Sequence, residues 1–276
     1  MQVERYLEKI KCEKFIEVSL ENLKQLQKNH LIEIPFENLD MHMKKPILFS
    51  LEDTYDRILN KSRGGYCVQL NSLFGWLLTR LGYHVSYLPC YIYNITTKRY
   101  SNLPIHIILM VKLDEKLYYV DVGTTRIIAE PIELRIDHVE KKTHGFYRFS
   151  LDGETYTLDR KGNNSNAEWI PQLKFILEPK ELGFFKEMND YVQTEEHPVL
   201  FHRSTVVIRF ENGIRFLIGN RYTEILLGAN CEETRKDEVL SDEQVRNYLK
   251  DKFNLEIDDS FVPVDTINSY FESLKK

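Results

Sequence analysis

The stretch that decides the fold is Lys61–Leu81, which reads KSRGGYCVQLNSLFGWLLTRL. Its adjacent glycines, Gly64 and Gly65, predict a turn whose backbone conformations other residues resist. After the turn, apolar residues recur at helical spacing and predict one buried helix face, at Leu70, Phe74, Leu77, Leu78 and Leu81. Cys67 therefore falls in the first turn of that helix, where free N–H groups and the positive dipole end favour an anion.

Two interpretations of Cys67 follow from this position. A helix start favours the thiolate, and a glycine turn lets a second backbone segment approach closely, which a nucleophile needs. However, free cysteine is also among the most buried residue types and often serves as a small hydrophobic side chain. A base and an orienting acid elsewhere in the chain would favour the catalytic interpretation.

The composition is that of a globular protein with 276 residues, 42% of them hydrophobic and 29% charged. A formal charge of -5 gives no electrostatic reason to expect nucleic acid or an anionic membrane as partner. No apolar run is long enough to span a membrane, and the charged N-terminus is not a signal peptide. Widely spaced cysteines predict reduced thiols in the cytoplasm and no zinc site: Cys12, Cys67, Cys90 and Cys231.

The chain before the glycine turn is expected to be helical. Residues 3–60 carry apolar stripes, and Ser19 and Ser50 are suitable N-caps for a second and a third helix. The segment Ile34–Leu39 separates these two helices, because Pro35 cannot continue a helix interior.

After Gly82 the pattern changes to strands. Asp114-Glu115 and Asp152-Gly153 predict hairpin turns. The runs around them are β-branched, aromatic or alternating, and they predict an antiparallel sheet or small barrel from Val85–Tyr93, Ile105–Val111, Lys116–Val122, Phe146–Leu151 and Thr155–Leu158. A polar loop is expected at Lys161–Asn166.

The last third mixes both patterns. A helix is expected at Phe184–Val192, a hairpin around Asn212-Gly213, and a capped helix from Ser241. The order is therefore helices, then strands, then an α/β part, which indicates an α+β fold. We expect the boundaries 1–83, 84–181 and 182–276.

Two polar residues stand in the predicted strands. His106 interrupts the apolar run Leu103–Met110, and a ring inside a strand needs a polar partner. Asp121 ends the run Tyr118–Asp121, and aspartate is rarely buried unless paired. Considered separately, each has a structural interpretation: a core histidine bonded to a carbonyl, and a turn aspartate bonded to backbone. Neighbouring strands lie about 5 Å apart, so a hydrogen-bonded pair of His106 and Asp121 would explain why both polar residues stand in predicted strands.

These motifs resemble those of the arylamine N-acetyltransferases. The family's Arg-Gly-Gly-x-Cys-x-Glu/Gln-x-Asn signature matches Arg63–Asn71, and its Pro-Phe-Glu-Asn motif matches Pro35–Asn38. The family's triad histidine in an apolar strand matches His106, and its Asp-Val/Ala-Gly motif matches Asp121–Gly123. The insertion of vertebrate members between the second and third parts is absent, so the chain is similar to bacterial-type members.

The resemblance implies a helical bundle, a central antiparallel β-barrel and a C-terminal α/β lid around a cysteine-protease-like core. It implies Cys67, His106 and Asp121 as the triad, and Phe36, Ile92 and Thr124 as amine-pocket residues. For Ile92, core packing is an equal alternative. It also implies acetyl-coenzyme A as cosubstrate, arylamines or arylhydrazines as acceptors, and no bound cofactor or metal.

One departure concerns the residues after the Asp-x-Gly motif, where the family usually has Phe-Gly and this chain has Thr124-Thr125. The loss of an aromatic ring and a glycine changes both the pocket wall and the freedom of the backbone. Two alternatives stay open: a hydrolase, because the same triad serves cysteine proteases, and a non-catalytic binder whose pocket Thr124-Thr125 has altered. Arg63 is expected to bond nearby carboxylates and hold the turn, and the cysteines other than Cys67 are expected to be inert.

Overall fold

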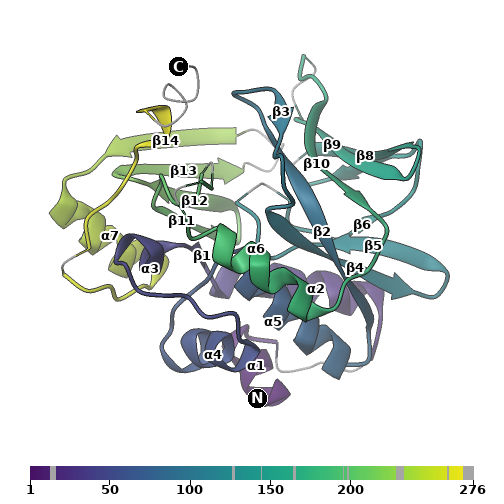
Figure 1. The fold of residues 1–276 in the computed structure, drawn as a ribbon, viewed down its shortest axis with the longest axis horizontal. Coiled ribbons are helices and arrows are strands. Elements are labelled where there is room, and N and C mark those ends of the chain that lie inside the picture. Colours follow the sequence, from purple (N-terminus) through teal and green to yellow (C-terminus); the bar gives the residue numbers. More distant parts are fainter. Residues whose placement is uncertain are drawn as a thin grey trace.

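The computed structural model describes residues 1–12, 17–125, 128–143, 145–163, 166–194, 196–197, 199–227, 233–259 and 261–269. Cys231 and part of the predicted 161–166 loop lie outside these residues. The chain forms three groups of elements, with helices at the bottom of Figure 1, a curved sheet at the upper right and a smaller sheet at the left. This is the α+β arrangement that the order of patterns predicts.

The helices of the first group begin where the sequence predicts. Ser19 Oγ accepts from Asn22 N at 3.2 Å, and Ser50 Oγ accepts from Asp53 N at 3.1 Å. The helix after Ser50 continues as a π-helical segment, η1 (Asp56–Asn60). The α-helices are α1 (Val3–Lys9), α2 (Leu20–Glu33), α3 (Leu39–His42), α4 (Leu51–Tyr55) and α5 (Cys67–Arg80).

The curved sheet has the strand order β6-β5-β4-β2-β10-β9-β8-β7 with β3 attached to β2, and its pairings are antiparallel. It curls into a nearly closed barrel (Figure 1) around buried aromatic side chains such as Tyr119, Phe149 and Phe175. The strands are β2 (His84–Asn94), β3 (Arg99–Tyr100), β4 (His106–Leu113), β5 (Lys116–Val120), β6 (Ile132–Glu133), β7 (Val139–Lys142), β8 (Gly145–Asp152), β9 (Thr155–Lys161) and β10 (Ile170–Ile176).

The hairpin turns follow the sequence prediction at Asp114-Glu115 but lie one residue away at the other two places. At the second hairpin, Asp152 pairs with Thr155, and Gly153 takes the first central turn position with φ +57°. At the third, Gly213 is already paired with Phe210, so the turn is Glu211-Asn212. A Cβ on Gly213 would lie 2.3 Å from the Ile225 carbonyl oxygen, so this glycine serves close strand packing and not the turn.

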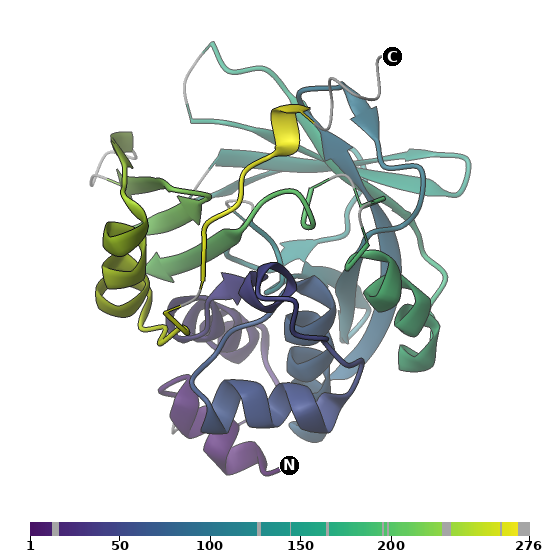
Figure 2. The same cartoon turned by 60° about the vertical axis from the view of Figure 1, so that its left-hand side comes forward.

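The smaller sheet has the order β1-β11-β12-β13-β14, and α7 (Asp242–Phe253) covers one of its faces (Figure 2). Its edge strand β1 (Phe36–Glu37) comes from the N-terminal part of the chain. Because this sheet joins the first and last parts, the boundaries 1–83, 84–181 and 182–276 stay a prediction. The other elements are η2 (Leu182–Phe185), α6 (Lys186–Tyr191), β11 (Thr205–Phe210), β12 (Gly213–Ile218), β13 (Arg221–Leu227) and β14 (Glu233–Val239).

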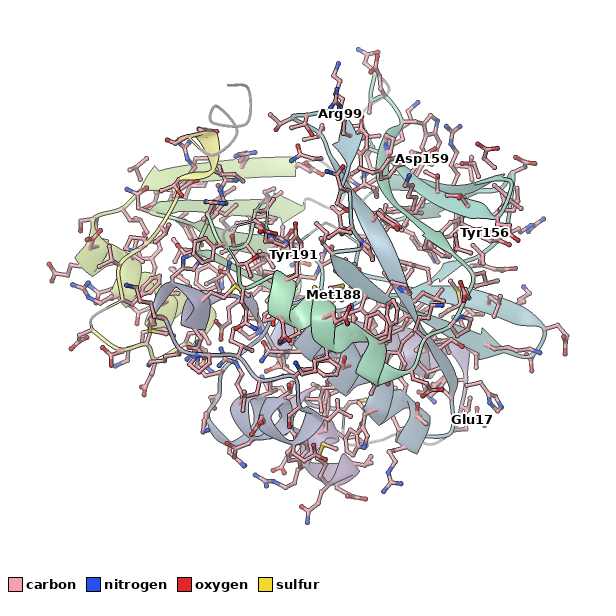
Figure 3. The ribbon with its side chains drawn as sticks, viewed as in Figure 1. Glu17, Arg99, Tyr156, Asp159, Met188 and Tyr191 are labelled. Carbon is pink, nitrogen blue, oxygen red and sulfur yellow. The ribbon has the colours of Figure 1, made fainter. Side chains whose placement is uncertain are left out.

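Two asparagines connect the last part of the chain to the region around Cys67. Asn38 Nδ2 donates to the Leu200 carbonyl at 2.8 Å, and Asn38 Oδ1 accepts from Thr205 N at 2.7 Å. On α6, Asn189 accepts a 2.5 Å hydrogen bond from the buried Tyr66 hydroxyl, while its neighbour Met188 (Figure 3) packs into the core beside α5. The N-cap residue of α5 is therefore held by an element more than one hundred residues away along the chain.

A cluster of ionised side chains holds the glycine turn. Arg63 donates to Glu37 Oε1 and Asp40 Oδ1, each at 3.0 Å, as the sequence predicts. Arg57, which the motifs did not indicate, bonds both carboxylates as well and donates from Nε to the Gly64 carbonyl at 2.6 Å. Burial raises the pKa of Asp40, but the two guanidinium groups lower it more, so the carboxylate stays ionised.

The first glycine of the turn is required by close packing. A Cβ on Gly64 would lie 2.0 Å from the Pro35 carbonyl oxygen. Next to it, Glu37 N donates to the Gly65 carbonyl at 2.8 Å. The Pro-Phe-Glu-Asn and Arg-Gly-Gly motifs therefore pack directly against each other in the fold.

We predict that Glu37→Gln destabilises the fold by about 3–5 kcal/mol, because it removes a fully buried charge facing two arginines. The matched control is Glu21→Gln, whose exposed ion pair with Lys24 contributes little. Urea unfolding of both variants is the measurement. Equal small changes in the two variants would show that the cluster is not a source of stability.

Candidate active site

Three residues far apart in the sequence meet between α5 and the barrel. Cys67 is the first residue of α5, His106 is the first residue of β4, and Asp121 directly follows β5. All three are buried, with 3%, 5% and 0% of their surfaces exposed. His106 Nε2 lies 2.7 Å from Asp121 Oδ2. Cys67 lies near enough to help raise the pKa of His106, and its Sγ is 3.8 Å from the carbonyl oxygen of Ile105, the residue before His106.

The contacts of His106 define its charge. Since Nε2 faces Asp121, Nδ1 is the ring nitrogen left for Cys67. Burial by itself lowers the pKa of His106, but the Asp121 carboxylate and Cys67 outweigh it and raise this pKa to about 10. The ring is therefore an imidazolium at neutral pH, and it provides a cation beside the Cys67 sulfur. The interpretation of His106 as a core histidine bonded only to backbone is wrong.

Asp121 accepts four hydrogen bonds. Its Oδ2 accepts from His106 Nε2 at 2.7 Å and from the Tyr119 hydroxyl at 2.8 Å. Its Oδ1 accepts from Asn71 Nδ2 at 2.8 Å and from Gly123 N at 2.9 Å. Burial raises the pKa of this carboxyl, but the His106 charge and the hydrogen bonds lower it below its ordinary value. Asp121 is thus a buried, paired carboxylate and not a solvated turn residue.

Asn71 connects the helix to both strands. Besides its bond to Asp121, Nδ2 donates to the Ile107 carbonyl at 2.7 Å, and Oδ1 accepts from Val122 N at 2.9 Å. Asn71 is part of the quoted motif, but sequence reasoning gave it no role. Its position four residues after Cys67 places both side chains on one helix face, and this spacing was the available signal.

The glycine of the Asp-Val-Gly motif permits the approach of the strand to the helix. A Cβ on Gly123 would lie 2.5 Å from Cys67 Cα and 2.9 Å from Asn71 Nδ2. No other residue fits here without displacing the start of α5. The motif therefore supplies a carboxylate and, two residues later, a glycine whose close contact brings that carboxylate to the helix that begins at Cys67.

The three predicted pocket residues have different positions relative to the triad. Phe36 is buried and forms a parallel bridge with Gly65, two residues before Cys67. Thr124 directly follows Gly123 in the loop after Asp121. Ile92 lies in β2 and packs against the core inside the barrel. Their roles in substrate binding stay predictions.

The remaining described cysteines differ in their environment. Cys12 is half-buried, and burial raises the pKa of its thiol, which disfavours the thiolate. Cys90 is fully buried in β2, where its register partner in β4 is His106. Their expected inertness stays a prediction, and Cys231 lies outside the described residues.

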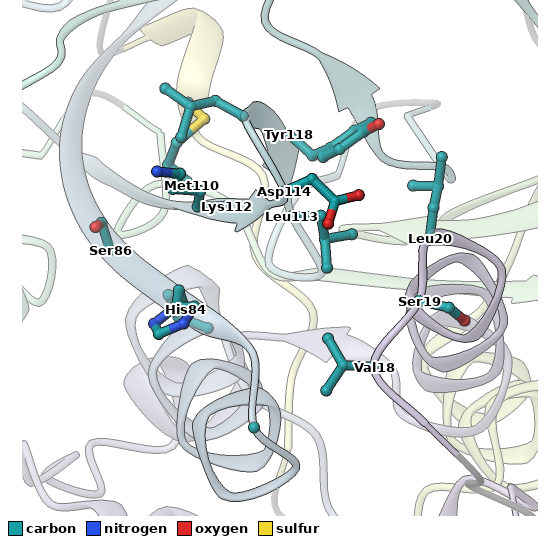
Figure 4. Close-up of a pocket in the computed structure, with 13 residues that line it drawn as sticks. Val18, Ser19, Leu20, His84, Ser86, Met110, Lys112, Leu113, Asp114 and Tyr118 are labelled. Atoms are coloured by element: carbon teal, nitrogen blue, oxygen red, sulfur yellow. The ribbon is translucent and has the colours of Figure 1, made fainter.

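A cavity of about 970 Å³ lies at the opposite end of β4 from His106 (Figure 4). It is open between Val18–Leu20 and the first residues of β2, with His84, Lys112 and Tyr118 among its walls. None of the predicted catalytic or pocket residues is among the described residues that line it. The cavity is therefore separate from the group formed by Cys67, His106 and Asp121.

The described part of the chain contains no group of three or more His, Cys, Asp or Glu side chains arranged to hold a metal ion. Among the same residues, no helix has the length and apolar character needed to cross a membrane.

Comparisons with known proteins identify the family of this chain. The model of a family described as N-acetyltransferase matches residues 19–262. Arylamine N-acetyltransferase pineal gland isozyme NAT-3 of Gallus gallus is 31% identical over 264 residues, which cover 90% of this chain and 91% of the relative. The arylamine N-acetyltransferase of Mycobacterium abscessus has a similar fold, with TM-score 0.82, 26% identity and coverage of 94% and 91%. The Mycobacterium marinum enzyme, solved in complex with CoA, has TM-score 0.81, 23% identity and coverage of 92% of both chains.

We predict that Asp121→Asn lowers stability by about 3–5 kcal/mol, because an uncompensated imidazolium or a facing pair of donors is then left buried. The matched control is Asp114→Asn, in the exposed turn between β4 and β5. Thermal or urea unfolding measures both. A near-native midpoint for Asp121→Asn would contradict the buried pair.

We also predict that iodoacetamide alkylates Cys67 rapidly at pH 6. The His106 imidazolium persists below pH of about 10, so a cation faces the sulfur at every pH from 6 to 9. His106→Ala should slow alkylation at pH 6 at least about tenfold, since the thiolate loses its counter-ion. Peptide mapping identifies the labelled residue, and Cys12 is the internal control. A rate at Cys67 that His106→Ala leaves unchanged would show that no ion pair exists.

Proposed function

The chain belongs to the arylamine N-acetyltransferase family and is an acyltransferase, and on that premise we propose that Cys67, His106 and Asp121 are its catalytic residues. In this proposal, acetyl-coenzyme A donates an acetyl group to Cys67, and an arylamine or arylhydrazine accepts it. The observation that carries the proposal is the 2.7 Å contact of His106 Nε2 with Asp121 Oδ2 beside the Cys67 side chain. The CoA-bound structure of the Mycobacterium marinum relative supports the choice of donor.

The first half-reaction forms a thioester on the enzyme. The Cys67 thiolate attacks the carbonyl carbon of acetyl-coenzyme A, and a tetrahedral oxyanion forms. The bond from that carbon to the sulfur of coenzyme A then breaks. The leaving thiolate takes the proton that the His106 imidazolium carries, so the products are acetyl-Cys67 and free coenzyme A.

The second half-reaction returns the enzyme to its starting state. The amine nitrogen attacks the acetyl carbon, and His106, now neutral, accepts the proton that the nitrogen loses. The bond to the Cys67 sulfur breaks, and the thiolate–imidazolium pair is restored. Since both half-reactions use one site, the kinetics are ping-pong.

Asp121 orients the ring without taking its proton. Its four hydrogen bonds and lowered pKa favour the ionised carboxylate, which fixes Nε2–H toward itself and Nδ1 toward Cys67. Backbone N–H groups at the start of α5 are the proposed donors to the tetrahedral oxyanion, because the first turn of a helix leaves them without helical partners.

We assign the acceptor pocket to Phe36, Ile92 and Thr124. The positions of Phe36 and Thr124 support this assignment. Phe36 pairs with Gly65, just before α5, and Thr124 follows Gly123, which lies against Cys67 at the start of α5. Thr124-Thr125 in place of Phe-Gly leaves a smaller and more polar wall, so we expect acceptors different from those of members with the aromatic residue.

The low exposure of Cys67, 3%, favours transfer over hydrolysis because it limits water at the thioester. We further propose that the enzyme acts in the cytoplasm, where sparse cysteines stay reduced.

We predict that incubation of the protein with acetyl-coenzyme A alone acetylates Cys67. Mass spectrometry of the peptide containing Cys67 should then show the added mass of one acetyl group. The group should disappear when an arylamine or arylhydrazine is added, together with formation of the acetylated amine. Cys67→Ser should not accumulate the thioester, whereas Cys12→Ser, far from the triad, should behave as the native chain. Release of acetate with no amide product would indicate a hydrolase, and absence of acylation would indicate a non-catalytic binder.

A further inference from the structure

Tyr119 places a hydroxyl group in the interior of the barrel. Its side chain is fully buried in the cluster that contains Phe149 and Phe175, and the centroid of its ring lies 6.4 Å from that of Phe149. A phenylalanine ring would make the same packing contacts. Because a buried hydroxyl costs free energy unless it is hydrogen-bonded, the acceptor of this hydroxyl is what distinguishes tyrosine from phenylalanine at this position.

The acceptor is the carboxylate oxygen that also faces His106. Tyr119 lies in β5 and Asp121 directly after it, and a spacing of two residues turns both side chains to one face of the strand. The Tyr119 hydroxyl donates to Asp121 Oδ2 at 2.8 Å, and His106 Nε2 lies 2.7 Å from the same oxygen. The bonds of Asn71 and Gly123 go to the other oxygen, Oδ1. Tyr119 therefore shares with His106 the oxygen that holds the imidazole.

A second donor on Oδ2 weakens the hold of this oxygen on the imidazolium. Burial raises the pKa of Asp121, while the His106 charge and the hydrogen bonds, that of Tyr119 among them, lower it. A carboxylate that the hydroxyl already stabilises gains less from the imidazolium, and the positive end of the O–H dipole points at the same oxygen as the imidazolium proton. Both effects favour the neutral imidazole. The Tyr119 hydroxyl thus opposes the rise in the pKa of His106 that Asp121 causes.

The proposed reaction needs an imidazole that gives up its proton and takes one back. Burial lowers the pKa of His106, but Asp121 and Cys67 together raise it to about 10. Acetylation of Cys67 removes the thiolate charge and leaves the Asp121 carboxylate to hold the proton on His106. A general base is most effective when its pKa lies near the working pH. A group that limits the effect of Asp121 therefore assists proton transfer from the amine.

We propose that Tyr119 is a positioning residue of the triad. Its hydroxyl shares Asp121 Oδ2 with His106 and keeps that oxygen from holding the imidazolium too tightly, so that His106 can accept the proton of the amine. This role rests on the proposed function, because the step that Tyr119 assists is the transfer of the acetyl group from Cys67.

Side chains of three further elements face the pair of His106 and Asp121. Cys67 of α5 acts on the pKa of His106, and Cys90 of β2 lies opposite His106 in the register of the two strands. From α2, the neutral side chain of Gln27 donates to the backbone carbonyl of Asp121 at 3.2 Å. Replacing Cys67 by serine removes the thiolate from the titration of His106, while Cys90 and Gln27 stay the same in every variant.

The first test measures the titration of His106 in Cys67→Ser, which needs no acetyl transfer. Isotope-labelled histidine gives an NMR signal for each ring, and His106→Ala identifies that of His106. Adding Tyr119→Phe should move the midpoint of this titration upward by about 0.5–1 pH unit, the effect of one hydrogen bond. The matched control is Tyr6→Phe, which removes a fully buried hydroxyl bonded to His30 Nδ1 at 2.8 Å and should leave the midpoint unchanged.

The second test separates this effect from a loss of packing. The native chain and Tyr119→Phe are acetylated at Cys67, and the single-turnover transfer to aniline is followed against pH. Because transfer requires neutral His106, Tyr119→Phe should be about three- to tenfold slower below the midpoint of the profile and equal to the native chain above it. Structural damage alone would slow the transfer at every pH. Circular dichroism checks that each variant is folded.

The outcomes distinguish the role of Tyr119 from the proposed function. A raised midpoint together with slower transfer only below the midpoint supports the role. An unchanged midpoint in Tyr119→Phe, an equal change in Tyr6→Phe, or a rate loss that is the same at every pH overturns it. If acetyl-coenzyme A does not acylate the native chain, the proposed function fails, and the NMR midpoint still decides whether Tyr119 weakens the hold of Asp121 on His106.

Discussion

The buried carboxylate of Asp121 is the constraint on which the arrangement of helix and barrel depends. A fully buried charge is stable only with an opposite charge and with hydrogen bonds to its remaining lone pairs. Here the partners come from three places: His106 on β4, Tyr119 on β5 with Gly123 just after it, and Asn71 on α5. Satisfying one carboxylate therefore fixes α5 against two strands, and the same contacts bring Cys67 to His106. In this chain the source of stability and the proposed source of reactivity are the same set of bonds.

Glycines determine how closely the backbone segments around Cys67 can approach. Gly64 allows contact with the Pro35 carbonyl, and Gly123 allows contact with Cys67 Cα. The Arg57 and Arg63 guanidinium groups then lock the turn to Glu37 and Asp40. The start of α5 is thus held on one side by an ion cluster and on the other by the Asp121 hydrogen bonds. If Cys67 is the nucleophile, as proposed, it loses little orientational freedom when it reacts.

Sequence patterns predicted element types well and contacts between elements only in part. The capping serines at 19, 50 and 241 lie where the helices begin, because a cap is a local interaction. Two hairpin turns lie one residue away from their predicted positions, because the glycine of one serves strand packing and the glycine of the other takes a different turn position. Both details depend on the register of the partner strand. Arg57 was missed because nothing in its own neighbourhood distinguishes a surface arginine from one that bonds two buried carboxylates. The family assignment was correct, since its motifs are specific and extend across most of the chain.

By itself, the sequence determined the local features: a glycine turn before a helix that starts at Cys67, an apolar strand carrying His106, and an acid followed two residues later by glycine. These follow from backbone preferences and periodicity, which act over a few residues. Only the tertiary structure decided that His106 Nε2 faces Asp121, that Asn71 joins helix to strands, and that β1 completes the sheet of the last third. Such contacts depend on segments that are far apart in the chain, and burial sets their charges: the imidazolium of His106 and the carboxylate of Asp121 exist together because neither can be buried alone.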